Sequence, residues 1–131
     1  MLIDELKNIA RNNGIVGAGG AGFPAYAKMT EKADTVILNC VECEPLLKLH
    51  RQLLATHTEE IIQMLDEVRE SFGAKEAVIG IKSEYVTTIK AIEEVIGDFP
   101  NVRICALKAA YPMGDEVVLI YEATGRVIKP G

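Results

Sequence analysis

The densest run of glycines in the chain offers backbone rather than side chains to a ligand. Residues 14–22 contain five glycines separated by Ile, Val and Ala, and Phe23-Pro24 follows. Glycine loses more conformational freedom on folding than other residues, so such a run is costly unless something lies close to the main chain. We therefore expect a large ligand to rest on the backbone around the last four of these glycines, which are Gly17, Gly19, Gly20 and Gly22.

The spacing Gly17-x-Gly19-x-x-Gly22 also matches the dinucleotide fingerprint, with Glu42 about twenty residues further on. That fingerprint follows a strand, whereas a helical pattern precedes this one and only Ile15-Val16 intervene. An ordinary dinucleotide fold and a flexible linker without ligand remain alternatives. The apolar residues between the glycines argue against the linker, because flexible linkers are rich in polar residues.

Two acidic loops follow predicted buried strands. The first is Asn39-Cys40-Val41-Glu42-Cys43-Glu44-Pro45, and the second is Tyr111-Pro112-Met113-Gly114-Asp115-Glu116. Ligands of open α/β sheets bind at the carboxyl ends of strands, where carboxylates can accept hydrogen bonds from ribose hydroxyls. We interpret both loops as parts of one ligand site, the alternative being that their acids are solvated loop residues.

The cysteines are a separate candidate source of chemistry. Cys40-x-x-Cys43 has the spacing of a metal or dithiol motif, but zinc and iron–sulfur sites usually need four ligands. The remaining candidates, Cys105, His50 and His57, show no paired spacing. Nearby carboxylates would raise the pKa of these thiols and lower their reactivity. We predict thiols and no metal site, and a dithiol enzyme is the weakest alternative.

Predicted helices and strands that follow one another along the chain would position these loops. Helical periodicity predicts helices over 2–13, over 58–72 after the capping box Thr56-His57-Thr58-Glu59, and from a Ser83 cap to Gly97. Nearly continuous apolar runs predict strands at 34–39, 77–81 and 102–107. Further helices are expected from Pro24 and over 115–124. The alternation predicts an α/β fold, Rossmann-like and doubly wound in three layers, with a mainly parallel sheet and helices on both faces.

The length, charge and composition of the chain limit the functions that it can have. The chain has 131 residues, the size of one domain, and its net charge of −5 argues against nucleic-acid binding. No apolar run approaches the roughly 18 residues that span a bilayer, and the first residues are acidic, so we expect a cytoplasmic protein without membrane insertion. Residues 126–131 start a new extended element, so we expect 1–131 to be the N-terminal, incomplete domain of a longer protein.

Three ordered motifs resemble a known family. They are the run Gly17-Ala18-Gly19-Gly20-Ala21-Gly22-Phe23-Pro24, then Asn39-x-x-Glu42-Cys43-Glu44-Pro45, then Tyr111-Pro112-x-Gly114-x-Glu116. Together they resemble the flavin-binding domain of Rnf complex C subunits and of the NADH-oxidising flavoprotein subunit of respiratory complex I. Residues 42–52 are also similar to the proline-reductase-associated electron-transfer protein and the cobalamin reductase of propanediol utilisation. The resemblance covers residues 10–131.

The resemblance implies an electron-transfer domain that binds FMN and NADH. Hydride would pass from nicotinamide to flavin, and electrons would continue to iron–sulfur clusters elsewhere in the parent protein, an NADH-dependent flavin oxidoreductase with other domains or subunits as partners. The chain alone is not expected to complete this path, because it stops before the family's cluster-binding cysteines. The alternative is a scaffold or docking domain of an electron-transfer complex that has lost its cofactor.

The resemblance also implies residue roles. The glycine loop with Phe23 would lie against FMN and NADH, Lys28 near the FMN phosphate, and Asn39 near the ribityl chain. Glu42 would tune the flavin as the catalytic residue, and Glu44 would lie near the nucleotide. The second flavin-contacting loop would supply Tyr111, Gly114, Asp115 and Glu116. Where the complex I form has an aspartate, a serine and a cysteine, this chain has Val41, Cys43 and Met113.

Overall fold

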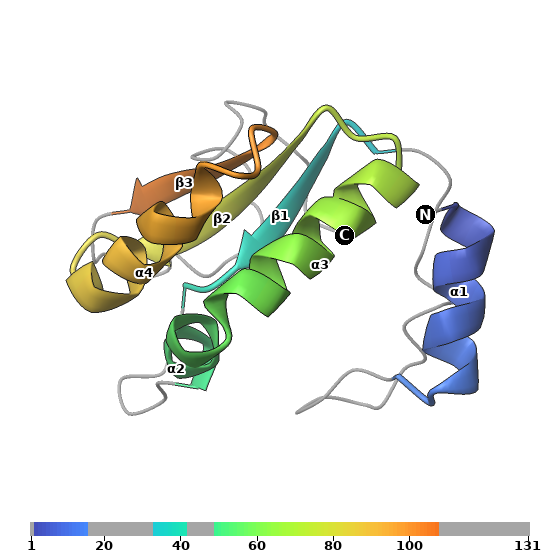
Figure 1. Cartoon of the computed structure of the whole chain (residues 1–131), viewed down its shortest axis with the longest axis horizontal. Coiled ribbons are helices and arrows are strands. Elements are labelled where there is room, and N and C mark those ends of the chain that lie inside the picture. The colour runs from blue at the N-terminus through green and yellow to red at the C-terminus, as the bar shows by residue number, and fades with distance from the viewer. Residues whose placement is uncertain (1, 16–32, 42–48, 108–131) are drawn as a thin grey trace, which may run out of the picture.

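The computed structural model of the chain describes residues 2–15, 33–41 and 49–107. Within these ranges each strand is connected to the next by helices, with two consecutive helices after the first strand and one after the second (Figure 1). In chain order the elements are α1 (Ile3–Asn12), β1 (Thr35–Asn39), α2 (Leu49–Thr56), α3 (Thr58–Ser71), β2 (Glu76–Lys82), α4 (Val86–Ile96) and β3 (Val102–Leu107). The predicted helices at 115–124 and after Pro24 lie outside the described residues.

The three strands form one parallel sheet in the order β1-β2-β3. Asn39 at the end of β1 pairs with Gly80 of β2, which in turn pairs with Cys105 of β3. β2 lies in the centre and is buried along most of its length, as its nearly continuous apolar sequence predicts. The predicted α/β fold with a parallel sheet is confirmed.

The main core lies between the sheet and the helices that connect its strands. Figure 1 shows α3 and α4 across one face of the sheet, with α2 at their lower end and α1 beside α3. The largest fully buried side chains of this core come from the central strand and from α2, α3 and α4, and they are Leu54, Ile62, Ile79, Ile81 and Ile92. On the opposite face, Val78, Val41 and Leu107 are also buried, so both faces of the sheet are covered.

Glycines end α1 and α3 in the same way. After α3, the N–H of Gly73 donates to the carbonyl of Glu70 at 3.0 Å, and the N–H of Ala74 donates to that of Arg69 at 3.0 Å. This pair of bonds satisfies helix carbonyls that would otherwise lack a donor and requires a left-handed residue, for which glycine is suited. Gly73 has φ +67° and Gly14, after α1, has φ +63°, which confirms both as helix stops.

Two glycine substitutions should therefore change stability in opposite directions. Gly73→Ala is expected to lower the free energy of unfolding by about 1–2 kcal/mol, because an alanine is strained at that left-handed φ. Gly97 ends α4 with φ −59° and ψ −25°, and a Cβ there would meet nothing within 4 Å. Gly97→Ala should raise the free energy of unfolding by about 0.4–1 kcal/mol by restricting the unfolded chain. Urea unfolding of the two variants checks both signs, and a loss of stability in both would contradict this account.

Two predicted helix caps are wrong, and one helix was not predicted. α2 occupies residues 49–56, so the Thr56 hydroxyl donates to the carbonyl of Gln52 at 2.8 Å within that helix and cannot cap α3, whose N-cap is His57. β2 extends to Lys82, and the N–H of Ser83 donates to the carbonyl of Leu107 at 2.7 Å. The chain is therefore still bonded to the sheet at Ser83, and α4 begins after Tyr85 instead.

An ion pair joins β2 and β3 near their amino ends. The Arg103 guanidinium donates to the Glu76 carboxylate from Nε at 3.0 Å and from Nη2 at 3.2 Å. The hydrogen bond from Arg103 to Glu76 raises the pKa of Arg103 above its ordinary value. Both side chains are more than one third exposed, so the pair is expected to contribute less than about 1 kcal/mol.

Within the described ranges no helix combines the length and the apolar character needed to cross a membrane.

Candidate functional site

Asn39 is the one predicted binding residue that falls within the described part of the chain. The others lie outside it and are Gly17, Gly19, Gly20, Gly22, Phe23, Lys28, Glu42, Glu44, Tyr111, Gly114, Asp115 and Glu116. The structure does describe the ends of β1 and β3, from which the two acidic loops leave. In this parallel sheet both ends lie at the carboxyl edge, so the two loops leave from the same edge, as expected.

Asn39 is held in place by backbone and side-chain hydrogen bonds. Its Oδ1 accepts a hydrogen bond from the N–H of Val41 at 3.0 Å, which closes a turn at the end of β1. The N–H of Cys40 donates to the carbonyl of Gly80 at 2.8 Å, so the turn is also tied to the central strand. Asn39 itself is exposed. An exposed amide thus has a defined position at the carboxyl edge.

Val41 has a packing role. Its side chain is 5% exposed and packs with Leu107, Ile37 and Cys105 on the face of the sheet opposite the connecting helices. A carboxylate at this position would be desolvated among apolar groups, which costs free energy unless it is paired. Valine at this position therefore stabilises the edge from which both acidic loops leave.

A third loop lies at this edge and was not singled out from the sequence. It connects β2 to α4 and contains Ser83, Glu84 and Tyr85. The N–H of Tyr85 donates to the carbonyl of Lys82 at 3.1 Å, and the Lys82 Nζ lies 5.9 Å from the centroid of the Tyr85 ring. The signal that could have found this loop is its position after the second strand, by the same rule that selected the other two.

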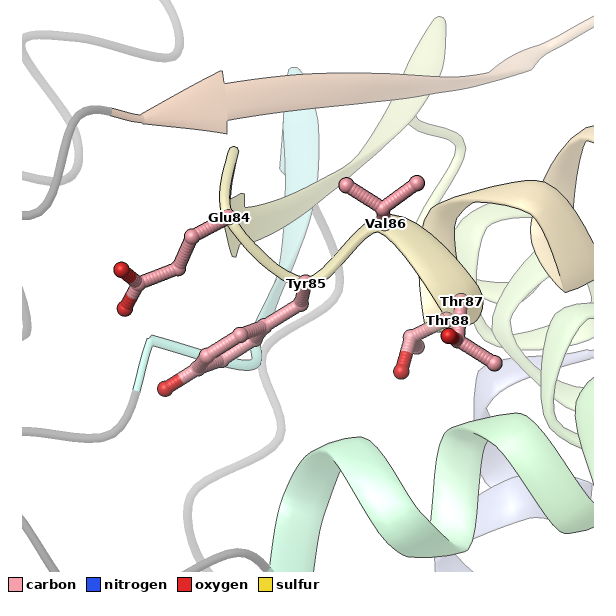
Figure 2. A pocket seen from close by; sticks show the side chains of 5 residues that line it. All are labelled: Glu84, Tyr85, Val86, Thr87 and Thr88. Atoms are coloured by element: carbon pink, nitrogen blue, oxygen red, sulfur yellow. The ribbon is translucent and has the colours of Figure 1, made fainter.

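An open pocket of about 290 Å³ adjoins the third loop. Figure 2 shows Glu84 and Tyr85 pointing away from α4, while Val86 points to the other side of the chain. Thr88, in the first turn of α4, is buried. The residues that line the pocket are consecutive: Glu84, Tyr85, Val86, Thr87 and Thr88.

A second hollow of about 210 Å³ lies between the end of β1, α2 and α3. Its lining is mainly apolar and consists of Leu38, Asn39, Cys40, Leu53, Leu54 and Ile61. A larger hollow of about 430 Å³ lies at the amino edge of the sheet, beside Asp34 and Lys75. We place the candidate site at the carboxyl edge in spite of this difference in volume, because the predicted binding loops leave from that edge.

Cys40 and Cys105 are thiols rather than partners in a disulfide. Cys40 is buried and Cys105 is half-buried, while Cys43 lies outside the described residues. Within the described ranges, no group of three or more His, Cys, Asp or Glu side chains is arranged to hold a metal ion.

An α/β domain with its candidate site at the carboxyl edge of a parallel sheet agrees with the comparisons with known proteins. Residues 10–131 match the model of the Nuo51 FMN-binding domain, and the chain belongs to this family. It is 38% identical over 125 residues to the cobalamin reductase PduS of Citrobacter freundii. It is 34% identical over 132 residues to the C subunit of the Na⁺-translocating ferredoxin:NAD⁺ oxidoreductase complex of Acetobacterium woodii.

The alignments cover nearly all of this chain but less than a third of each relative. The alignments include 95% and 98% of this chain but 27% and 30% of the two relatives. Among solved structures, the chain is similar to an NAD⁺-reducing [NiFe]-hydrogenase in the air-oxidised state, with a TM-score of 0.75 and 25% identity. That match covers 96% of this chain and 25% of the other. The predicted family, branch and fold class are thereby confirmed.

Proposed function

We propose that this chain binds FMN at the carboxyl edge of its sheet and positions NADH against it, as the flavin- and nucleotide-binding part of an electron-transfer oxidoreductase. The observation that carries this proposal is the match of residues 10–131 to an FMN-binding domain family. When bound, FMN would supply the chemistry of accepting a hydride from nicotinamide and releasing electrons singly. The protein's own contribution is to bind, orient and exclude water.

The described residues suit such a cofactor. Asn39 presents an amide at the carboxyl edge, where a ribityl chain needs hydrogen-bonding partners. Gly80, its neighbour in the central strand, has no side chain to obstruct the middle of this edge. The roles proposed for the residues outside the described ranges follow the family pattern: the glycine loop and Phe23 beneath the rings, Lys28 at the phosphate, and Glu42 beside the flavin. Glu44 and the loop of Tyr111, Gly114, Asp115 and Glu116 would complete the site.

The wider role is also a proposal. The relatives named above are about three to four times the length of this chain, as their coverage of 30% and 27% shows. We propose that iron–sulfur clusters in other parts of the protein receive the electrons, that other subunits are its partners, and that it works in the cytoplasm, peripheral to a membrane complex.

A visible spectrum tests the proposal directly. The full chain, incubated with FMN and freed of excess cofactor, should retain a flavin spectrum that is bleached when NADH is added without oxygen. Retained flavin without bleaching would overturn NADH as the donor. A folded protein that retains no flavin would overturn the proposal and would favour a scaffold or docking domain instead.

Substitutions of Asn39 test whether the carboxyl edge of the sheet contributes to FMN binding. Asn39→Ala should weaken FMN binding about tenfold, because it removes both the amide and the acceptor that positions the turn. Asn39→Asp keeps an oxygen that can accept the Val41 N–H but loses the amide donors. Titration of FMN by fluorescence quenching should therefore show a loss for both variants. Wild-type affinity in Asn39→Asp would show that only the turn, and not the amide, matters.

A further inference from the structure

We propose that Lys82 binds a phosphate group of the nucleotide at the carboxyl edge, which makes it a binding residue outside the three family motifs. This inference rests on the proposed function. Lys82 is the last residue of β2 and pairs with Leu107. It lies on the same face of the central strand as Gly80, two residues, or about 6.6 Å, further along. Lys82 is therefore placed between the ends of β1 and β3, from which both predicted binding loops leave.

The electrostatic surroundings of Lys82 differ from those of the two described arginines that form salt bridges. Arg103 is paired with Glu76, and Arg69 with Asp66. Lys82, in contrast, forms no salt bridge with any residue in the described ranges, and its Nζ lies 5.9 Å from the centroid of the Tyr85 ring. An aromatic face attracts an ammonium group without neutralising its charge. Within the described residues, the positive charge is therefore not paired with a carboxylate.

The backbone around Lys82 restricts where its side chain can go. The bond from the N–H of Ser83 to the carbonyl of Leu107, at 2.7 Å, fixes the end of β2 against β3. The bond from the N–H of Tyr85 to the carbonyl of Lys82, at 3.1 Å, closes a turn after the strand, and the Tyr85 ring centroid lies 5.9 Å from the lysine Nζ. A lysine that is half-buried and placed in this way loses less conformational freedom on binding than a fully solvated one.

A phosphate is the ligand chemistry that fits best. The ammonium has three N–H donors and no acceptor, and charge-assisted bonds to phosphate oxygens are among the stronger hydrogen bonds in proteins. The chain has a net charge of −5, so a positive charge at the candidate site contrasts with the overall excess of acidic residues. Both FMN and NADH carry phosphate groups, and either could supply the partner.

Comparing each ligand with its phosphate-free analogue shows whether Lys82 contacts the FMN phosphate or the NADH pyrophosphate. The dissociation constants of FMN and riboflavin, and of NADH and dihydronicotinamide riboside, would be measured with the full chain and with Lys82→Ala. We expect about a tenfold weaker binding of whichever phosphate-bearing ligand contacts Lys82, with less than about a twofold change for its phosphate-free analogue. A loss for FMN would assign Lys82 to the flavin phosphate, and a loss for NADH would assign it to the pyrophosphate.

Control variants distinguish charge from structure. Lys75→Ala removes an exposed lysine just before the same strand, at the opposite, amino edge, and should leave all four constants unchanged. Lys82→Arg keeps the charge and should bind within about threefold of the wild type. Unchanged constants in Lys82→Ala, or an equal loss for the phosphate-free analogues, would overturn the inference. A wild-type chain that binds neither FMN nor NADH would overturn the proposed function together with it.

Discussion

Replacing Gly19 with valine is expected to abolish flavin binding while leaving the fold intact. In the proposed site a flat isoalloxazine ring rests on the backbone of the glycine loop, and an isopropyl group would occupy the space of the ring. Inserting a side chain of this size into a close contact costs about 1–3 kcal/mol or more. Because the ring would rest directly on the backbone at this position, we expect a cost at or above the upper end of this range, which raises the FMN dissociation constant by about 100-fold or more. FMN titration followed by visible absorbance measures the effect, and far-ultraviolet circular dichroism reports the fold.

Gly97→Val is the matched control for Gly19→Val. It makes the same chemical change at the end of α4, where a Cβ meets nothing within 4 Å and the backbone is helical. This variant should bind FMN as the wild type does. If Gly19→Val still retains flavin, the glycine loop does not form the floor of the site.

Replacing Ile79 with alanine should have the largest effect on stability. Ile79 is 0% exposed in the centre of β2 and pairs with Leu38 on one side and Ile104 on the other. Removing the larger part of a side chain from such a position leaves a cavity and is expected to lower the free energy of unfolding by about 2–5 kcal/mol. For a domain of ordinary stability this is a large fraction of the total. Urea unfolding would show a lower midpoint with an unchanged slope.

Ile9→Ala provides the comparison for Ile79→Ala. Ile9 lies on α1 and is 45% exposed, so the same truncation there should change the free energy of unfolding by no more than about 0.5 kcal/mol. Equal changes in the free energy of unfolding at the two positions would mean that the central strand does not form the centre of the core as described.

Local signals predicted most of the fold because the strands and their connecting helices are encoded by simple periodicities. The predicted strand at 102–107 has the observed bounds, and the predicted helix at 58–72 differs by one residue from α3. α2 was missed because it is only eight residues long and has neither an acidic first turn nor a basic last turn to mark its ends. Its presence also changed the use of Thr56, whose hydroxyl bonds within α2. The four-residue capping pattern does not show that its first residue already belongs to a preceding helix.

The candidate site was predicted less completely than the fold. The rule that ligands bind at the carboxyl ends of strands placed Asn39 correctly at that edge, because strand ends can be read from apolar runs. Lys82 and Tyr85 were not found, since their relation depends on a turn that brings an aromatic ring back over the end of a strand. Sequence spacing alone does not report such a contact, whereas the loop as a whole could have been selected by its position.

The position of β2 between two neighbours implies a gradient of amide hydrogen exchange across the sheet. Amides in the middle of β2 are buried between β1 and β3, so they should exchange only when the whole sheet unfolds. The amides of Val41 and Tyr85 are held instead by single bonds within turns, at 3.0 Å and 3.1 Å, and should exchange through local opening. The carboxyl edge thus joins a rigid strand to turns that open more readily. A nucleotide bound there would slow amide exchange at the turns. The exchange rate at the centre of β2 would still be set by the stability of the whole domain.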